Sequence, residues 1–291
     1  MLNKAPLKET VYSLRHGQVA AQVCLTDSAR PLFVMLHGWQ DNSGSFNVLA
    51  ETLSQHADLV MPDWPGHGLS DHKGEGYFYP FFDYVDDLNQ LIEQLPLEGR
   101  PLYIIGHSLG ALVGSCWCAT WPEKVQGLVM IEALGPMSER DSNVVERLRR
   151  ASEGRDRLKP MRKLNSLDEA VKLRMGINKV SDEAIRPLVE RGTVCDGEQW
   201  FWRHDARLRS ESNFRMSPRH AEQIVRSIQC PVLALLGDDG YPELRSHQAN
   251  DRKAWFAQLE VALIQGKHHC HMQSPDQTLE AILHFAQRTG R

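Results

Sequence analysis

The sequence predicts an α/β protein in which a mostly parallel sheet is covered by helices on both faces. Three observations lead to this prediction. Short, continuous apolar runs recur along the chain, and such runs are typical of strands that are buried on both faces. Segments with apolar residues at helical spacing alternate with these runs, as in sheets whose parallel strands are joined by crossover helices. The 291 residues are 42% hydrophobic and 24% charged, a globular balance that excludes disordered and fibrous proteins.

The expected elements can be placed in chain order. An alternating segment at residues 10–25 predicts an antiparallel hairpin that turns at residues 15–18. The apolar runs predict buried strands at residues 32–36, 59–61, 102–105, 128–131, 232–236 and 261–264. Helical spacing predicts helices at residues 45–53, 84–95, 109–121 and 275–287, and the third of these is apolar all round, as in a buried helix.

Residues 137–217 interrupt this alternation. The segment has no strand-like run and many charged helix formers, so we expect a helical lid inserted into a body formed by residues 1–136 and 218–291. It holds 18 Lys and Arg against 14 Asp and Glu, a net charge of +4, whereas the rest of the chain carries −8. This positive charge either solvates amphipathic helices or attracts an anionic substrate.

Composition also limits the partners and the compartment. The net charge of −4 argues against nucleic acid as a main partner, and no apolar run reaches the ~18 residues of a membrane span. The first ten residues lack the apolar core of a secretory signal. The six cysteines have no zinc-type spacing, which favours reduced thiols. We therefore expect a cytoplasmic protein with no membrane span. A small-molecule substrate and the absence of a cofactor are expected from its catalytic motifs.

The strongest chemical signal is Gly-His-Ser-Leu-Gly at residues 106–110, directly after an expected strand. A G-x-S-x-G element between a strand and a helix is a nucleophile elbow. Its glycines let the neighbouring backbone pass close, so that Ser108 projects its hydroxyl from the top of the sheet. The N-terminus of the following helix favours developing negative charge at this point. Ser108 is therefore the candidate nucleophile.

A serine hydroxyl needs a base, and the histidine-rich loop after the last expected strand can supply one. His268, His269 and His271 all lie in this loop, which should open on the same sheet edge as Ser108. A metal site formed by these histidines and Cys270 is an alternative. Adjacent ligands on one short loop rarely converge on one ion, and no carboxylate or second cysteine pair supports such a site, so we expect no metal.

An oxyanion hole is expected where the first buried strand ends, in the sequence His-Gly-Trp at residues 37–39. The loop that follows can direct the backbone N–H of Trp39 towards the same point as the backbone N–H of Leu109. Two preorganised donors of this kind stabilise the charge that develops on a carbonyl oxygen in acyl transfer. The alternative is a simple turn at the end of the strand.

Together these motifs resemble the α/β-hydrolase superfamily and, within it, the serine hydrolase-like proteins. The resemblance covers about residues 32–288. It rests on the order of the His-Gly-Trp motif, Asp-Trp-Pro-Gly-His-Gly-Leu-Ser at 63–70, Gly-His-Ser-Leu-Gly-Ala at 106–111, the helical insertion and a late Gly-x-His at 266–268. The stretch Asp205-x-Arg207-Leu208, which follows Trp200 and Trp202, is similar to that branch in particular.

The resemblance implies the α/β-hydrolase fold and a role for each residue at a matching position. Ser108 matches the nucleophile, and Trp39 and Leu109 match the oxyanion donors. His268 matches the catalytic histidine, because family members place it seven residues before a proline, as His268 is placed before Pro275 here.

The acid is where the sequence departs from the family. Relatives usually carry Gly-x-x-Asp after the strand that precedes the last helix–strand pair, but residues 237–240 read Gly-Asp-Asp-Gly. Asp239, or second to it Asp238, could reach the histidine through a shifted loop. Glu132 is preferred, because some relatives place the acid at that strand end and Glu has one more methylene to span the sheet edge. For Glu132 we expect a carboxylate oxygen within ~3.2 Å of His268 Nδ1.

Aromatic residues gather near the expected sheet edge and in the inserted segment. If they converge, they form an apolar acyl pocket, and Trp64, Trp200 and Trp202 are then the candidate substrate-binding residues. The alternative is that they pack the lid against the body. The aromatic residues considered are Trp39, Trp64, Phe81, Phe82, Trp200 and Trp202.

These residues together favour a serine hydrolase of the carboxylesterase type, acting on a small or medium acyl ester through an acyl-Ser108 intermediate. Serine at this position excludes epoxide hydrolases and haloalkane dehalogenases, which need aspartate. Lactonase, thioesterase, perhydrolase and carbon–carbon bond hydrolase chemistry remain possible on the same residues, although Trp39 and His107 argue against the last. A non-catalytic ligand-binding protein is the alternative from another class, because Gly240 stands where an acid is usual. A third hypothesis is a scaffold protein that acts through the positively charged segment at residues 137–217.

Overall fold

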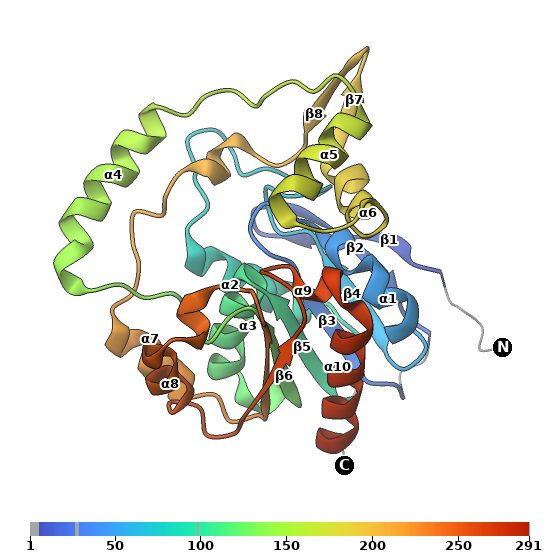
Figure 1. Cartoon of the computed structure of the whole chain (residues 1–291), viewed down its shortest axis with the longest axis vertical. Helices are drawn as coiled ribbons and strands as arrows, with labels where there is room; N and C mark the ends of the chain where they lie inside the picture. Colours follow the sequence, from blue (N-terminus) through green and yellow to red (C-terminus); the bar gives the residue numbers. More distant parts are fainter. Residues whose placement is uncertain (1–5, 27–28, 98, 291) are drawn as a thin grey trace.

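The computed structural model describes residues 6–26, 29–97 and 99–290, and an eight-stranded sheet runs through its centre (Figure 1). The strands lie in the order β1-β2-β4-β3-β5-β6-β9-β10. β2 pairs antiparallel with β1 and β4, and all other neighbours pair parallel. The bounds are β1 Lys8–Leu14, β2 Gly17–Cys24, β3 Leu32–Leu36, β4 Asp58–Pro62, β5 Leu102–His107, β6 Gly127–Ile131, β9 Val232–Gly237 and β10 Leu259–Ile264.

Helices cover both faces of this sheet. Those on one face are α2, α3 and α7, and those on the other are α1 and α10. The bounds of all helices are α1 Asn47–Leu53, α2 Phe81–Ile92, α3 Leu109–Thr120, α4 Val144–Asp156, α5 Leu167–Asn178, α6 Asp182–Gly192, α7 Pro218–Arg226, α8 His247–Lys253, α9 Cys270–Gln273 and α10 Pro275–Thr289. Short 3₁₀ turns lie at residues 43–46, 122–124, 141–143, 206–209 and 242–245.

The continuous apolar runs form strands because each residue is buried on one face or the other. In β3, Leu32 and Leu36 belong to the core beneath α2 and α3, whereas Phe33 and Met35 belong to the core beneath α1 and α10. The six expected buried strands are all present, each within two residues of its predicted ends. The predicted α/β fold class, with its mostly parallel sheet, is confirmed.

The segment at residues 137–217 is not purely helical, and the prediction was wrong on this point. Besides α4, α5 and α6 it contains a two-stranded hairpin of β7 (Thr193–Asp196) and β8 (Gln199–Trp202). Gly197 and Glu198 form the two-residue turn between them, and Gly197 has a φ of +61°. Glycine at the first central position of a two-residue hairpin loop is a known turn signal, so the sequence carried part of this information.

Buried contacts hold part of this segment against the sheet. Side chains of α5, α6 and the β7–β8 hairpin form an apolar cluster that also includes Met272 of α9 and contacts Val48 of α1. Arg191 at the end of α6 forms ion pairs with buried Asp63 (2.9 Å) and with Glu9 (2.6 Å). Helix α4 instead stands apart from the sheet in Figure 1. The hairpin and α5–α6 are therefore anchored above the edge of the sheet.

No helix in the described ranges combines the length and apolar character that crossing a bilayer requires.

Candidate active site

Ser108 lies between β5 and α3 with a φ of +48° and a ψ of −116°, a conformation that residues with a side chain rarely adopt. The two flanking glycines allow it. A Cβ on Gly106 would lie 2.5 Å from Ala111 Cα, and a Cβ on Gly110 would lie 2.7 Å from Leu36 Cβ. The Ser108 N–H donates to Ile131 O at 2.9 Å, which ties the turn to β6. The local geometry is that of a nucleophile elbow.

His268 follows β10, and contacts on several sides fix its ring. Its Nδ1 donates to Glu132 Oε2 at 3.3 Å. The Tyr241 ring packs against it with the centroids 4.2 Å apart, and the His107 ring lies 4.8 Å away on the same measure. His107 Nε2 also donates to the His268 carbonyl at 2.9 Å. Tyr241 was not among the sequence candidates, because nothing in its local pattern indicates that it would reach a histidine loop.

Glu132 follows β6 with a φ of +54°, and it is only 3% exposed. Its carboxylate accepts the backbone N–H groups of Gly237 (2.7 Å) and Tyr241 (3.1 Å) in addition to His268 Nδ1. The separation from Nδ1 is 0.1 Å longer than the expected upper limit of ~3.2 Å. The carboxylate is thus held in place by two loops that follow different strands.

The Glu132 carboxylate fills the space in which a side chain at position 240 would lie. A Cβ on Gly240 would lie 2.6 Å from Glu132 Oε2, so a larger residue at position 240 would displace the carboxylate. The alternative acids point elsewhere: Asp238 Oδ1 accepts the Gly266 N–H at 2.8 Å, and exposed Asp239 forms an ion pair with Lys267. Of the three candidate acids, Glu132 is the one whose carboxylate contacts the His268 ring.

The Ser108 hydroxyl and the His268 ring, both within the described ranges, are not joined by a direct hydrogen bond. Catalytic hydrogen bonds are often long or poorly aligned without substrate and shorten when it binds. The structure therefore brings His268 and Glu132 into contact and leaves the contact between Ser108 and His268 open.

The residues expected to form the oxyanion hole line the same cavity as Ser108. Leu109 is the first residue of α3, where backbone N–H groups lack an intrahelical partner. Trp39 lies across from it after β3, and its indole Nε1 donates to Leu208 O at 2.9 Å. The next residue, Gln40, has a φ of +59°, so the chain turns sharply here. Leu208 belongs to the 137–217 segment, which therefore contacts the candidate site directly.

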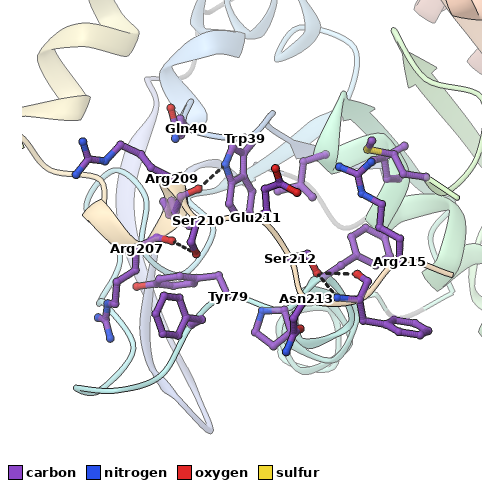
Figure 2. Close-up of a pocket in the computed structure, with 18 of the residues that line it drawn as sticks. Trp39, Gln40, Tyr79, Arg207, Arg209, Ser210, Glu211, Ser212, Asn213 and Arg215 are labelled. Atoms are coloured by element: carbon purple, nitrogen blue, oxygen red, sulfur yellow. Dashed lines mark hydrogen bonds between the residues drawn. The ribbon is translucent and has the colours of Figure 1, made fainter. Parts of the chain in front are cut away.

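The cavity beside Ser108 measures about 500 Å³ and is lined by the body and by the segment at residues 137–217 (Figure 2). A cavity of this size suits a small-molecule ligand. The segment contributes the stretch from Arg207 to Arg215, as well as Met137 and Arg155. Its aromatic and aliphatic lining consists of Trp39, Phe78, Tyr79, Phe81, Leu109, Leu112, Met137, Leu208 and Phe214.

Trp64, Trp200 and Trp202 are not among the described residues that line this cavity. Trp64 is 3% exposed, and its indole N–H donates to His37 O at 3.0 Å inside the core. Trp200 and Trp202 pack on the apolar cluster of α5 and α6. Sequence reasoning instead missed Phe78, Tyr79 and Phe214, because which aromatic faces a cavity depends on the path of the segment above the sheet.

A cluster of three histidines and an aspartate includes the residue that directly precedes Ser108. It consists of His107, His269, His271 and Asp41. Burial lowers the pKa of His107 well below its usual range and lowers that of His271 to about 3, so both rings are neutral near pH 7. Burial also raises the pKa of Asp41, but its interactions with His269 and Arg174 outweigh burial and hold this pKa well below its usual value. Asp41 is therefore a buried carboxylate that is compensated by its neighbours.

Asp41, His107 and His269 are the described residues that could approach a metal ion, since their ligand atoms lie within 4.8 Å of one another. Two of the three already have protein partners: Asp41 forms an ion pair with Arg174, and His269 Nε2 lies 2.9 Å from Asn178 Nδ2. His107 Nδ1 is buried without a hydrogen-bond partner in the described part of the chain and lies 3.7 Å from Asp41 Oδ2. Burial raises the pKa of the neighbouring Cys270 thiol to about 12, which disfavours a thiolate ligand. The cation that pairs with Asp41 in this cluster is the guanidinium of Arg174.

Comparison with known proteins identifies the family to which this fold belongs. A family model described as alpha/beta hydrolase fold matches residues 31–275. The chain is 29% identical over 293 residues to a serine hydrolase-like protein of Danio rerio, covering 93% of this chain and 86% of that protein. It is 35% identical over 122 residues to the pimeloyl-[acyl-carrier protein] methyl ester esterase of Chromobacterium violaceum, covering 42% and 44% of the two chains. The crystal structure of the hypothetical protein PA1622 from Pseudomonas aeruginosa superposes with a TM-score of 0.86 at 31% identity, covering 97% of this chain and 99% of that one.

Proposed function

The chain belongs to the α/β-hydrolase superfamily, in its serine hydrolase-like branch, and on that premise we propose that it cleaves a small or medium acyl ester through an acyl-Ser108 intermediate. The observation that carries the proposal is the strained Ser108 turn in the wall of the cavity. A strained backbone conformation persists only where the surrounding structure maintains it, and such conformations cluster at active sites and ligand-binding sites.

In this mechanism His268 is the general base and Glu132 orients it. The Ser108 proton passes to His268 Nε2 as Ser108 Oγ attacks the carbonyl carbon of the ester. The backbone N–H groups of Trp39 and Leu109 donate to the resulting oxyanion. His268 then gives the proton to the leaving alkoxide, and the C–O bond breaks. Water repeats the sequence on the acyl-enzyme, which releases the carboxylic acid and restores the Ser108 hydroxyl.

Glu132 has two tasks in this scheme. As an acceptor at 3.3 Å it keeps the proton on Nδ1, so that Nε2 is free to take the serine proton. As a buried negative charge it stabilises the imidazolium that forms. The two backbone N–H groups that donate to it hold the carboxylate in this position.

We further propose that residues 137–217 act as a lid that selects the acyl group. Support comes from the stretch at residues 207–215, which forms a wall of the cavity, and from the hydrogen bond between Trp39 and Leu208. We also assign the protein to the cytoplasm, a proposal supported by the free thiols of Cys116, Cys118, Cys195, Cys230 and Cys270.

The test is turnover of p-nitrophenyl esters and acyl thioesters graded from acetyl to dodecanoyl, by the wild type and by Ser108→Ala. The partial similarity to a methyl ester esterase favours esters over thioesters. The proposal predicts turnover that depends on Ser108 and peaks at one acyl length. Turnover that survives in Ser108→Ala, or a folded wild type that is inactive on the whole panel, would contradict it. The second result would favour the non-catalytic ligand-binding protein.

A further inference from the structure

The charged side chains that line the Ser108 cavity are mostly positive. Its described lining includes four arginines, at positions 155, 207, 209 and 215, and a single carboxylate, Glu211. That carboxylate already lies near other cations, with Arg147 Nη1 at 3.3 Å and Arg150 Nη2 at 3.5 Å. The lining therefore has an excess of positive charge that Glu211 does not neutralise.

Two of the four arginines have protein partners. Arg207 forms an ion pair with Asp205 and also donates to the carbonyls of Gly74 and Tyr77. Arg209 donates to the carbonyls of Ala206 and Lys159. The guanidinium groups of both are used in holding the segment together.

Arg155 and Arg215 differ from this pair, because neither has a carboxylate within ion-pair distance among the described residues. The Arg155 guanidinium carbon lies 4.1 Å from the Phe78 ring centroid, and its Nε is buried without an acceptor. Burial, together with the charge of Arg147, lowers the pKa of Arg215 from its usual value, and the charges of Glu139 and Glu211 offset this shift only in part. Both side chains are partly buried, and an anion that binds them would form charge-assisted hydrogen bonds with guanidinium groups that have no ion-pair partner among the described residues.

We propose that Arg155 and Arg215 provide an anion subsite in the Ser108 cavity, which binds a carboxylate or phosphate of the substrate. The substrate class is then an ester or thioester with an apolar stretch and one anionic end. Leu112, Met137 and Phe214 line the same cavity and suit the apolar stretch. This inference rests on the proposed function and names the substrate class of that site.

Arg155 also borders a second hollow, which is lined by Lys73 and Tyr77. The two cavities share Phe78, Pro80, Arg155 and Asn213. An anion at Arg155 can therefore belong to the acyl chain inside the Ser108 cavity or to a leaving group that extends outward. In the first case the anionic group belongs to the acyl half of the substrate, and in the second case it belongs to the leaving-group half.

Two matched substrate pairs distinguish these sources. Mono-p-nitrophenyl adipate and p-nitrophenyl hexanoate have six-carbon acyl chains and differ in a terminal carboxylate. Hexanoyl-4′-phosphopantetheine and hexanoyl-pantetheine share the acyl group and differ in one phosphate on the leaving group. The readout is the anionic-to-neutral ratio of kcat/KM, measured in the wild type, Arg155→Gln and Arg215→Gln. Arg149→Gln is the control. Arg149 is exposed on α4, and its substitution changes the net charge by the same amount as the other two.

The inference predicts that this ratio falls tenfold or more in Arg155→Gln and Arg215→Gln for one of the pairs, and stays within twofold of the wild type in Arg149→Gln. The pair that responds identifies the side of the substrate that carries the anion. A ratio unchanged in both pairs overturns the subsite, even if the enzyme cleaves neutral esters through Ser108. If no ester is cleaved, calorimetry of adipate and phenyl phosphate on Ser108→Ala decides. Binding that weakens tenfold in the arginine variants supports the subsite without the proposed function, and binding that is absent or unchanged overturns it.

Discussion

The edge of the sheet that carries Ser108 and the segment at residues 137–217 are built in different ways. At the sheet edge the strands are buried, and Gln40, Ser108 and Glu132 adopt positive φ values that the surrounding packing maintains. In the segment, α4 buries only Arg147 and Ala151, and many of its charges form exposed ion pairs. Exposed pairs contribute little to stability, so α4 is weakly fixed by comparison. The difference suggests that the sheet edge sets the chemistry and that the segment sets the substrate.

Replacing the proposed base tests the sheet edge most severely. His268→Ala should lower kcat by ~10³-fold or more, because members of a triad act as a unit. His269→Ala is the matched control from the same loop and should retain most activity. Steady-state kinetics on the best ester of the panel measures both. Loss of activity in His269→Ala with activity kept in His268→Ala would show that the loop presents a different histidine.

The acid is tested by amide substitutions that keep the size of each side chain. Glu132→Gln should lower kcat by ~10²- to 10⁴-fold, because the amide cannot stabilise the imidazolium. Asp238→Asn and Asp239→Asn are controls on the neighbouring loop and should stay close to the wild type, since their carboxylates bind Gly266 and Lys267. The opposite pattern of kcat values would place the acid on the loop after β9.

The shared space of Glu132 and Gly240 offers a sharper test of the same edge. Gly240→Asp alone should inactivate the enzyme, because the new side chain meets the Glu132 carboxylate. In Glu132→Ala that space is vacated, so Glu132→Ala/Gly240→Asp should recover ~10-fold or more of the kcat lost in Glu132→Ala. A double variant no more active than Glu132→Ala would mean that position 240 cannot present a carboxylate to His268.

A change in the body away from the site should affect stability alone. Asp87 is buried, neither of its carboxylate oxygens has a hydrogen-bond partner among the described residues, and burial raises its pKa to about 7. Between about pH 4 and about pH 7 the folded state keeps a proton that the unfolded state releases, so stability falls as the pH rises through this window. Asp87→Asn should therefore be more stable than the wild type at about pH 8, by on the order of 1–3 kcal/mol, with little difference near pH 4. Urea unfolding at both pH values measures this, and an equal effect at the two would contradict the raised pKa.

The two regions also differed in how far the sequence predicted them. The strands and the Ser108 turn could be located because burial on both faces imposes apolar runs, and the close approach of Ala111 and Leu36 imposes glycine. The contact between Glu132 and His268 joins loops that are 136 residues apart in the chain. Because local sequence patterns do not reveal such a contact, the sequence limited the candidates for the acid to three positions. The cavity lining was predicted only in part, because the sequence does not distinguish aromatic side chains that line the cavity, such as Trp39 and Phe81, from one that packs in the core, such as Trp64.

The central claim is that Ser108 is an activated nucleophile, and labelling with a fluorophosphonate probe tests it most directly. The account predicts one adduct per chain, mapped by mass spectrometry to the peptide that contains Ser108, with no adduct in Ser108→Ala. Ser142→Ala, a change in an exposed serine of the segment, should label like the wild type. An adduct on another residue, equal labelling of Ser108→Ala, or a folded wild type that does not react would contradict the claim.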